Sequence, residues 1–515
     1  MKNSDLNGTR QRVRAIVETT GRYQVILCIL LSIHSAIVAF NHTEPAFLNY
    51  EPAFRCKDNG TIKEYIGCAS LQNGTCHTGF EFAEDERTII TDFSLVCSRR
   101  YLAALATVLY FGGVTIGALV FGPLADRLGR RKVTLICLYT QAALGILQGL
   151  LGSYGGFVIF AALRMLQGAF VQGLQSSTFT LLLELFPVRH RTAVAVIWEI
   201  FWAGGCAFMA SVAWILADWR YLQIVLALPA IVSVIYSWNI PESALWLTTI
   251  GKYRSAHQVC DRIMRFNGTK QDMNRNGTTC QSEQLVENVV SDPVIEKIGL
   301  IGIFKNSLLR KHALVMTMVW FSVTLCYYGT VFYLPKLDGQ RHVNFLIGAF
   351  IEVVAYLLAF WALSKFGRRW PTALYQILCG AICATVAGIT FYTGHHQGML
   401  IIGLILAGKG IAVSCFCCMF LYTSELFPTS VRGAALGLCG FWSRIGGLLS
   451  PLLLVLGEIT DRSVPLMCLG ALALVTGFIS LALPDTNNTT LPDTIAEAQT
   501  AYNKSYPKSQ ENTHV

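Results

Sequence analysis

Glu184-Leu185-Phe186-Pro187, followed by Arg191, returns later in the chain as Glu425-Leu426-Phe427-Pro428, followed by Arg432. The copies lie 241 residues apart, and in each of them the glutamate precedes the arginine by seven positions. An exact repeat of this kind over such a distance indicates an internal duplication, with one copy of the phrase in each half of the chain.

A second phrase is doubled almost in step with the first. Gly129-Arg130-Arg131 returns as Gly367-Arg368-Arg369, 238 residues later. Each of the four phrases lies just outside an apolar stretch. Two unrelated phrases that repeat at nearly one offset predict two homologous halves in a membrane, which is how many secondary transporters are built.

The composition is that of a membrane protein. Of the 515 residues, 53% are apolar and only 14% are charged, and the mean hydropathy is +0.49, whereas a soluble chain carries roughly a quarter charged residues. Stretches of roughly 20 apolar residues, the length that crosses a bilayer, recur along the sequence. We predict an all-α membrane protein whose twelve transmembrane helices form two pseudo-symmetric bundles of six, with spans near 22–40, 101–122, 133–152, 156–180, 192–216, 221–240, 313–334, 343–364, 371–392, 398–422, 433–456 and 464–483.

Loop charge predicts the orientation. The long segment 41–100 is net acidic and the long segment 247–312 is net basic, while Arg127, Arg130, Arg131 and Lys132 cluster between the second and third spans. Basic loops face the cytoplasm. We therefore predict a cytoplasmic N-terminus (1–21), an N-terminal bundle (22–240) with an extracellular loop (41–100), a cytoplasmic central loop (241–312), a C-terminal bundle (313–484) and a cytoplasmic tail (485–515), with the plasma membrane as the location. The net charge of +9 is explained by these loops, so no nucleic-acid partner is expected.

The extracellular loop should carry covalent modifications. Four of the 17 cysteines lie in it, Cys56, Cys68, Cys76 and Cys97, and an even number in an oxidising compartment predicts two disulfides, whose three pairings the sequence leaves open. Asn59 and Asn73 each begin an Asn-x-Thr triplet and are predicted glycosylation sites. Asn41 begins a third triplet, close to the membrane.

Several motifs resemble those of a known family. The segment from Gly122 to Lys132, together with Arg164, Gln167 and Gly168 in the fourth span, resembles the signatures of the major facilitator superfamily. Four further phrases are similar to those of its organic cation, carnitine and organic anion transporters: Asp92 to Cys97, Pro241-Glu242-Ser243, Ser424 to Thr429, and Leu491 to Ile495. The chain departs from that pattern at Leu245, where the family usually has arginine.

The resemblance implies a role for the doubled phrases. By that analogy they are cytoplasmic latches, whose ion pairs between helices form in the outward-facing state and part when the inner side opens. Exposed pairs contribute only about 0–1 kcal/mol, enough to bias a balanced conformational equilibrium. The expected gating residues are Asp126, Arg127, Arg130, Glu184, Arg191, Glu425 and Arg432. The alternative is that they form ordinary surface salt bridges.

Charged and aromatic residues inside the spans predict a substrate site, because an intramembrane charge is costly and usually functional. Glu199 lies among tryptophans, where a carboxylate and an indole could hold an ammonium group. Arg444 could grip a carboxylate through two parallel hydrogen bonds, and the resemblance associates arginine at this position with anion and carnitine transport. The expected substrate-binding residues are Glu199, Trp202, Tyr327, Tyr328, Glu352, Tyr356 and Arg444.

These charges favour a zwitterion such as carnitine or a betaine as substrate, with an organic anion and then an organic cation as alternatives. Arg444 could instead neutralise one of the glutamates. Gly403, Gly408 and Lys409 imitate a phosphate-binding loop, but Gly410 follows where serine or threonine is required, so we expect no nucleotide. We also expect no metal, no cofactor and no enzymatic activity. Na⁺ coupling, H⁺ coupling, exchange and uncoupled transport all remain open.

Overall fold

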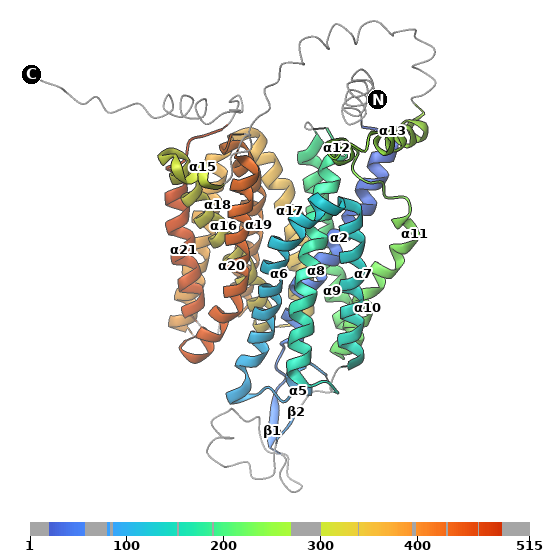
Figure 1. Ribbon diagram of the computed structural model, residues 1–515. Helices are drawn as coiled ribbons and strands as arrows, with labels where there is room; N and C mark the ends of the chain where they lie inside the picture. Colours follow the sequence, from blue (N-terminus) through green and yellow to red (C-terminus); the bar gives the residue numbers. More distant parts are fainter. Residues whose placement is uncertain are drawn as a thin grey trace, which may run out of the picture.

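The computed structural model describes residues 20–56, 80–82, 86–151, 154–187, 190–268, 300–337, 339–393, 398–428, 431–461 and 463–486. Almost all of these residues are helical, and the long helices run side by side in two groups, one from each half of the chain (Figure 1). Within the described residues, eleven helices or helix pairs are long and apolar enough to cross a membrane, and the shorter apolar helix Val464–Ser480 accompanies them. The all-α membrane architecture predicted from the sequence is confirmed.

The N-terminal half contains the following elements: α2 (Arg22–Thr43), α3 (Pro45–Leu48), β1 (Phe54–Cys56), β2 (Phe80–Phe82), α5 (Ile89–Asp92), η1 (Cys97–Arg99), α6 (Tyr101–Leu128), α7 (Arg130–Leu151), α8 (Gly156–Glu184), α9 (Arg191–Ile215), α10 (Trp219–Val232), α11 (Val234–Ser237), α12 (Ala244–Thr249) and α13 (Tyr253–Asn267). The C-terminal half contains α15 (Leu300–Lys305), α16 (Ser307–Tyr333), η3 (Leu334–Lys336), α17 (Arg341–Phe366), α18 (Arg369–Thr393), α19 (Gly398–Leu426), α20 (Arg432–Ile459) and α21 (Val464–Ser480).

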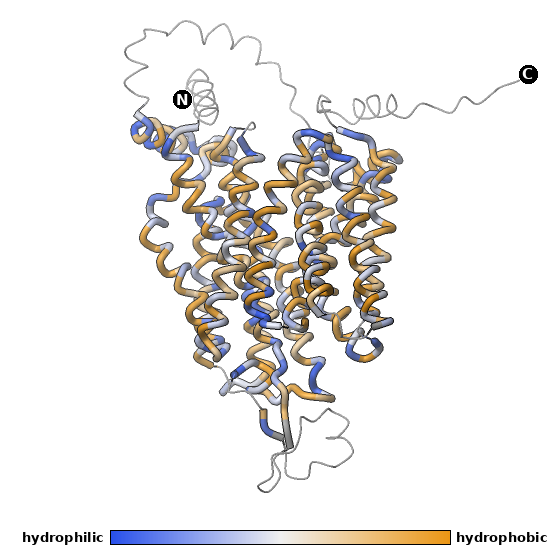
Figure 2. The backbone as a smooth tube through the Cα atoms, turned by 180° about the vertical axis from the view of Figure 1, so that it is seen from behind, coloured by the Kyte–Doolittle hydropathy of each residue, from blue (hydrophilic) through white to orange (hydrophobic). Residues whose placement is uncertain are grey.

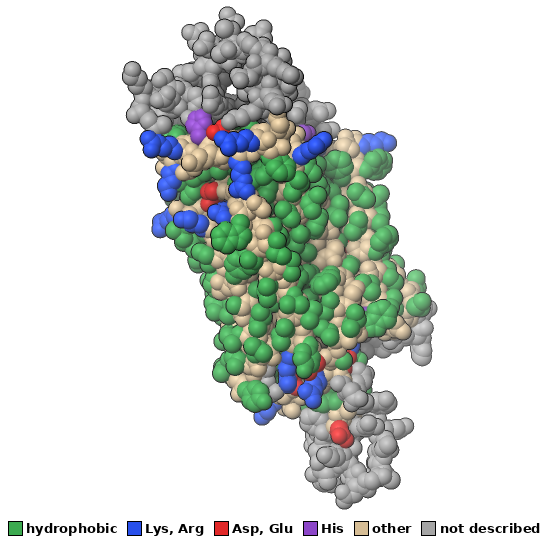
Figure 3. All heavy atoms as spheres, turned by 90° about the vertical axis from the view of Figure 1, so that its right-hand side faces the viewer, with side chains coloured by type: hydrophobic (Ala, Val, Ile, Leu, Met, Phe, Trp, Pro, Cys, Tyr) green, Lys and Arg blue, Asp and Glu red, His purple; other side chains and the backbone are tan. Residues whose placement is uncertain are grey.

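The two ends of the bundle differ. We call the end that carries both doubled phrases, α12 and α13 the motif end, and the end that carries β1, β2 and α5 the loop end (Figure 1). β1 and β2 pair antiparallel, with Phe54 opposite Phe82. Between the ends, most residues along the helices are hydrophobic (Figure 2). On the face shown in Figure 3, apolar side chains form a broad belt and lysine and arginine gather at its two ends, as expected of a surface that meets lipid.

The doubled Gly-Arg-Arg phrase has a local structural reason. Gly129 ends α6 with φ +106°, and Gly367 ends α17 with φ +80°. These positive values suit glycine, because it has no Cβ to clash with its own backbone. Each glycine therefore reverses the chain between two long antiparallel helices, at equivalent places in the two halves.

Several predicted span boundaries differ from the structure, and two of the differences change the interpretation of the chain. The first span was expected to end at residue 40, but α2 continues to Thr43 and α3 extends the helical segment to Leu48. Asn41 consequently lies inside the bundle, with 5% of its surface exposed, where a glycan would not fit. The sixth span was expected to be one helix over 221–240, but it breaks between α10 and α11 at Ser233, four residues after Pro229. Pro229 itself lies inside α10, and the helix is interrupted one turn later, where the hydroxyl of Ser233 donates to the carbonyl of Ala230.

Helices α6 and α8 pack backbone to backbone through glycines. A Cβ on Gly113 would collide with the carbonyl oxygen of Met165, one on Gly117 with that of Ala169, and one on Gly168 with that of Tyr110. Small residues are what allow transmembrane helices to approach this closely. The contact fixes α8, which carries Arg164, against α6, which lines the interface between the halves.

We predict that Gly113→Ala lowers the melting temperature of the purified protein, because the added methyl group forces the two helix backbones apart at a cost of about 1–3 kcal/mol. Gly112→Ala is the matched control, since a Cβ there has no heavy atom within 4 Å and alanine favours the helix. Thermal unfolding in detergent measures both. Equal melting temperatures for the two variants would contradict the packing argument.

Candidate functional site

A cavity lies between the two halves, near the middle of the spans. Its walls include six of the seven predicted substrate-binding residues: Glu199, Trp202, Tyr327, Tyr328, Tyr356 and Arg444. Its free volume is about 80 Å³, well below the roughly 300–1,000 Å³ of pockets that hold drug-sized ligands. In this conformation the site is therefore assembled but too small for an organic ion, and the halves or the side chains must move to admit one.

Aromatic side chains make up much of the wall. The ring of His42 lies 5.6 Å from that of Trp202 and 5.7 Å from that of Phe111, centroid to centroid. Phe111 in turn meets Tyr328 at 4.8 Å, and Tyr328 meets Tyr327 at 5.1 Å. These five residues come from both halves, and we call them the aromatic wall. Aromatic faces of this kind attract cations, above all quaternary ammonium groups.

Two charged residues of the wall, on opposite halves, have no ion-pair partner among the described residues. Glu199 on α9 accepts a hydrogen bond from the hydroxyl of Tyr356, at 3.0 Å. Arg444 on α20 donates to the backbone carbonyl of Gly440, at 3.0 Å. The predicted alternative in which Arg444 neutralises a glutamate is not what the structure shows. Both charges are available to a ligand.

Glu352, the seventh predicted binding residue, is absent from the described residues that line the cavity. It is fully buried behind Tyr327, whose hydroxyl donates to its Oε1 at 3.0 Å. The same oxygen lies 2.9 Å from Nζ of Lys409 on α19. Glu352 and Lys409 therefore neutralise each other inside the C-terminal half, and a direct contact between Glu352 and a substrate stays a prediction.

Two hydrogen bonds of the cavity wall join the halves. Nε1–H of Trp202, from α9, donates to the hydroxyl of Tyr327, from α16, at 3.0 Å. The hydroxyl of Tyr356, from α17, donates to Glu199, again from α9. A ligand that binds Glu199 or Trp202 must compete with these bonds, so binding and the contact between the halves are physically linked.

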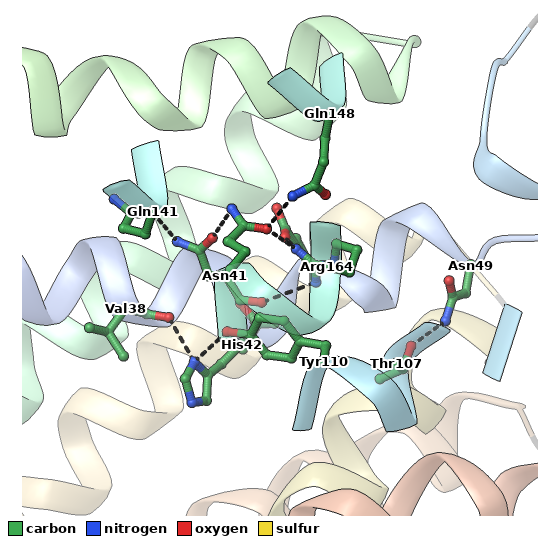
Figure 4. A network of polar contacts seen from close by, with 12 residues as sticks. Val38, Asn41, His42, Asn49, Thr107, Tyr110, Gln141, Gln148 and Arg164 are labelled. Atoms are coloured by element: carbon green, nitrogen blue, oxygen red, sulfur yellow. Dashed lines mark hydrogen bonds and ion pairs between the residues drawn. The ribbon is translucent and has the colours of Figure 1, made fainter. Parts of the chain in front are cut away.

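A buried polar network lies behind the aromatic wall in the N-terminal half (Figure 4). Arg164, with 2% of its side chain exposed, forms an ion pair with Glu44, with 1% exposed. Its guanidinium also lies over the ring of Tyr110, 4.4 Å from the centroid, and the hydroxyl of Tyr110 is 3.0 Å from Nδ1 of His42. The ion pair is thus connected to the cavity through Tyr110 and His42.

Amide side chains complete this network. The amide of Gln167 donates to Asn41 at 2.7 Å, and its carbonyl oxygen accepts from Arg164 at 2.9 Å. Gln148 donates to the same oxygen at 2.9 Å, and Gln141 accepts from Asn41 at 3.3 Å. A charge pair in an apolar interior needs such additional bonds to offset its desolvation. The network ties α2, α7 and α8 into one unit.

Sequence reasoning missed His42 and Glu44. The polar run Asn41-His42-Thr43-Glu44 lowers the hydropathy, and we therefore assigned it to the extracellular loop. Hydropathy cannot distinguish a solvated polar run from one whose groups are bonded inside a bundle. One signal was available: Arg164 in the fourth span requires an acidic partner, and Glu44 is the carboxylate nearest in sequence to the first span's end.

The doubled phrases pair with each other within each half. Nε of Arg130 lies 3.3 Å from Glu184, and its Nη2 lies 2.7 Å from Asp126. In the C-terminal half, Arg368 grips Glu425 through Nε and Nη2, both 3.0 Å from a carboxylate oxygen. In each half, the glutamate of the Glu-Leu-Phe-Pro phrase thus binds the first arginine of the Gly-Arg-Arg phrase.

The remaining predicted gating residues are arranged differently. Arg191 and Arg432 each direct Nε to the backbone carbonyl of the phenylalanine in their own phrase, Phe186 and Phe427, at 3.4 Å. Arg127 is exposed. The gating role of the phrases stays a prediction.

Ion pairs also join the halves at the loop end. Arg100 lies 2.8 Å from Glu51 and 3.1 Å from Glu458, which belongs to the C-terminal half. Arg341 of the C-terminal half pairs with Glu86 of the N-terminal half and lies over the ring of Tyr50, 3.5 Å from its centroid. These contacts bridge the halves at the loop end, around a cavity of about 640 Å³ whose lining includes Arg100, Arg341 and Glu458.

Most of the predicted modification sites lie outside the described residues. Cys97 is disulfide-bonded, but Cys68, Cys76, Asn59 and Asn73 lie outside the described residues, and of Cys56 only the backbone in β1 is described. The disulfide pairing and the glycosylation therefore stay predictions.

Comparison with known proteins identifies the family. The profile of the Major Facilitator Superfamily matches residues 89–451. Solute carrier family 22 member 6 of Oryctolagus cuniculus is 32% identical over 80% of this chain and 73% of its own length. The chain belongs to solute carrier family 22 of the major facilitator superfamily. It is accordingly a multi-pass membrane transporter and not an enzyme.

Other relatives cover more of the chain. Solute carrier family 22 member 6-A of Xenopus laevis is 30% identical over 85% of this chain and 77% of its own length. The organic cation transporter protein of Drosophila melanogaster is 29% identical over 95% of this chain and 94% of its own length. The similarity of this solute carrier to its relatives thus extends over nearly the whole sequence.

Solved structures agree on the fold. The inward-open conformation of the xylose transporter XylE from E. coli has a TM-score of 0.66 and 16% identity, covering 93% of this chain and 99% of that one. The proton:xylose symporter XylE bound to 6-bromo-6-deoxy-D-glucose has a TM-score of 0.60 and 17% identity, covering 93% and 99%. At these identities the likeness shows the major facilitator fold alone.

We predict that Arg164→Met destabilises this solute carrier strongly, because it leaves Glu44 as an unpaired buried charge at a cost of about 3–5 kcal/mol. The double variant Glu44→Gln/Arg164→Met removes both charges and should recover much of the loss in melting temperature. Thermal unfolding of the three proteins makes the comparison. A double variant less stable than Arg164→Met would contradict the pairing.

Proposed function

We propose that this chain is a secondary transporter that moves a small organic zwitterion, such as carnitine or a betaine, across the plasma membrane by alternating access. The observation that carries the proposal is a pair of opposite charges in the cavity wall, neither of which has an ion-pair partner among the described residues. Glu199 belongs to the N-terminal half and Arg444 to the C-terminal half. A ligand with one positive and one negative group satisfies both of them at once.

The chemistry of the two charged groups of a zwitterion supports this proposal. A quaternary ammonium group makes no hydrogen bonds and is held by aromatic faces and a nearby carboxylate, which the aromatic wall and Glu199 provide. A carboxylate is matched by the planar fork of a guanidinium, which donates two parallel hydrogen bonds, and Arg444 provides that fork. Transport then needs no covalent chemistry, only differential binding to the two conformations.

Binding is linked to movement because the ligand bridges the halves. On binding Glu199, it displaces the hydrogen bond from Tyr356 and replaces it with a connection to Arg444. The bridged protein can close around the ligand, whereas the halves of the empty protein hold together through Trp202 and Tyr356. Both the empty and the loaded protein can then change which side of the membrane the site opens to, as alternating access requires.

The ion pairs at the two ends support specific roles in that cycle. Arg100 with Glu458 and Arg341 with Glu86 bridge the halves at the loop end, so these pairs must part when that end opens. We assign the loop end to the outside and both chain termini to the cytoplasm. The proposed latch at the motif end comprises Asp126, Arg127, Arg130, Glu184, Arg191, Glu425 and Arg432.

The alternative is an organic anion transporter that works by exchange. One observation favours it: Glu199 is partly satisfied by the hydroxyl of Tyr356, whereas Arg444 has only a backbone carbonyl among the described residues. The positive charge would then dominate. A simple organic cation, the further alternative, is disfavoured by Arg444 for the same reason.

We predict that proteoliposomes containing the purified chain take up labelled L-carnitine in preference to tetraethylammonium and glutarate. Arg444→Gln should reduce carnitine uptake at least tenfold, since it removes the carboxylate's partner, and Glu199→Gln should do the same through the ammonium group. Initial rates with and without a Na⁺ gradient measure both the preference and the coupling.

Arg99→Gln is the control for this series, because Arg99 is exposed at the loop end and its loss should leave uptake unchanged. A wild-type preference for glutarate selects the anion alternative, and a preference for tetraethylammonium selects the cation. Transport of none of the three probes would contradict the proposal.

The orientation is tested separately. We predict that a membrane-impermeant maleimide labels Arg87→Cys, which is exposed at the loop end, on intact cells, and labels Lys311→Cys, exposed at the motif end, only after permeabilisation. Labelling is compared with that of the wild-type chain, which corrects for its own cysteines. The reverse pattern would invert the topology.

A further inference from the structure

We infer that Lys409 determines the charge preference of the transport site without touching the substrate. It does so by neutralising Glu352, which would otherwise add a second negative charge next to the cavity. This inference rests on the proposed function, because it concerns the same site. It assigns a specificity-determining role to a lysine that lies outside the described cavity wall.

The pair is sealed inside the C-terminal half. The side chains of Glu352 and Lys409 are 0% and 1% exposed, and Nζ lies 2.9 Å from Oε1. Space for the ammonium group comes from Gly348, where a Cβ would lie 3.0 Å from Nζ. The ring of Phe345 lies 5.1 Å from the same nitrogen. Water has no access to screen the pair, so each charge acts on its surroundings through a low-dielectric medium.

The Glu352–Lys409 pair is also close to the cavity that we propose as the ligand site. Glu352 accepts a hydrogen bond from Tyr327, and Tyr327 is part of the cavity wall. One side chain therefore separates the buried carboxylate from the cavity. The hydroxyl of Tyr327 and Nζ of Lys409 both contact Oε1 of Glu352, so the negative member of the pair is the one that is hydrogen-bonded to the cavity wall.

The sum of the charges in and next to the cavity predicts which substrates the site favours. The wall contributes one negative group, Glu199, and one positive group, Arg444, and the buried pair contributes one of each. The sum is zero, which suits a zwitterion. Without Lys409 the sum becomes negative and organic cations gain; without Glu352 it becomes positive and organic anions gain. Since charges of this kind interact strongly across a few ångströms of protein, each shift should be about tenfold.

The experiment measures charge preference as a ratio. Full-length Lys409→Met, Glu352→Gln and the double variant are reconstituted in proteoliposomes, and tetraethylammonium and glutarate compete for uptake of L-carnitine. The ratio of their inhibition constants should move about tenfold toward tetraethylammonium in Lys409→Met and about tenfold toward glutarate in Glu352→Gln. The double variant should return to the wild-type ratio.

A charge reversal covers the case in which a single variant fails to fold. Glu352→Lys/Lys409→Glu keeps a buried pair but turns its positive end toward Tyr327, so it should shift the ratio toward glutarate. An unchanged ratio in the folded single variants, or in the reversed pair, overturns the inference. So does a double variant that keeps the preference of either single one.

The two proposals fail in different ways. The proposed function concerns which probe the wild-type chain prefers, whereas this inference concerns the direction in which the ratio changes. If the wild-type chain takes up one of the other probes in place of carnitine, that probe becomes the labelled substrate and the same ratio is measured.

Discussion

The structure depends on how the chain places charges in an apolar interior. A charged group inside a membrane protein is expensive unless it is paired and hydrogen-bonded. Arg164 meets this condition with Glu44, and Lys409 meets it with Glu352. Glu199 and Arg444 do not meet it among the described residues, and they face the same cavity from opposite halves. We propose that a ligand supplies the missing partners of these two charges.

The contacts within each half hold its helices together as one unit. In the N-terminal half the polar network around Arg164 ties three helices together, and glycines lock α6 against α8. At the motif end, Arg130 binds Glu184 and Arg368 binds Glu425, so the doubled phrases brace equivalent helices in the two halves. Rigid halves with breakable contacts between them are what a transporter that alternates its access requires.

The fold could be predicted from the sequence because its determinants are local or repeated. Apolar length gave the spans, and the doubled phrases gave the two halves. Boundaries failed where polarity was misleading: Asn41 to Glu44 looked like the start of a loop, although their side chains are bonded inside the bundle. The break at Ser233 could not be placed from Pro229, because α10 continues through that proline and ends only at Val232.

The site could be predicted only in part. Residue type identified six members of the cavity wall, including Glu199 and Arg444, since a charge or a cluster of aromatic groups in a span already suggests function. Partnership could not be deduced in the same way. That Glu352 is held by Lys409, and that His42 joins the aromatic wall, depends on how α17 meets α19 and how α2 meets α6, which one sequence does not reveal.

The central claim is that one ligand bridges Glu199 and Arg444 across the halves. A cryo-electron microscopy structure of the chain in lipid nanodiscs with saturating L-carnitine tests it most directly. The account predicts a carboxylate bound by both terminal nitrogens of Arg444, with the trimethylammonium group against the aromatic wall beside Glu199. Carnitine bound elsewhere, or Glu199 and Arg444 paired directly with each other around an empty cavity, would contradict it.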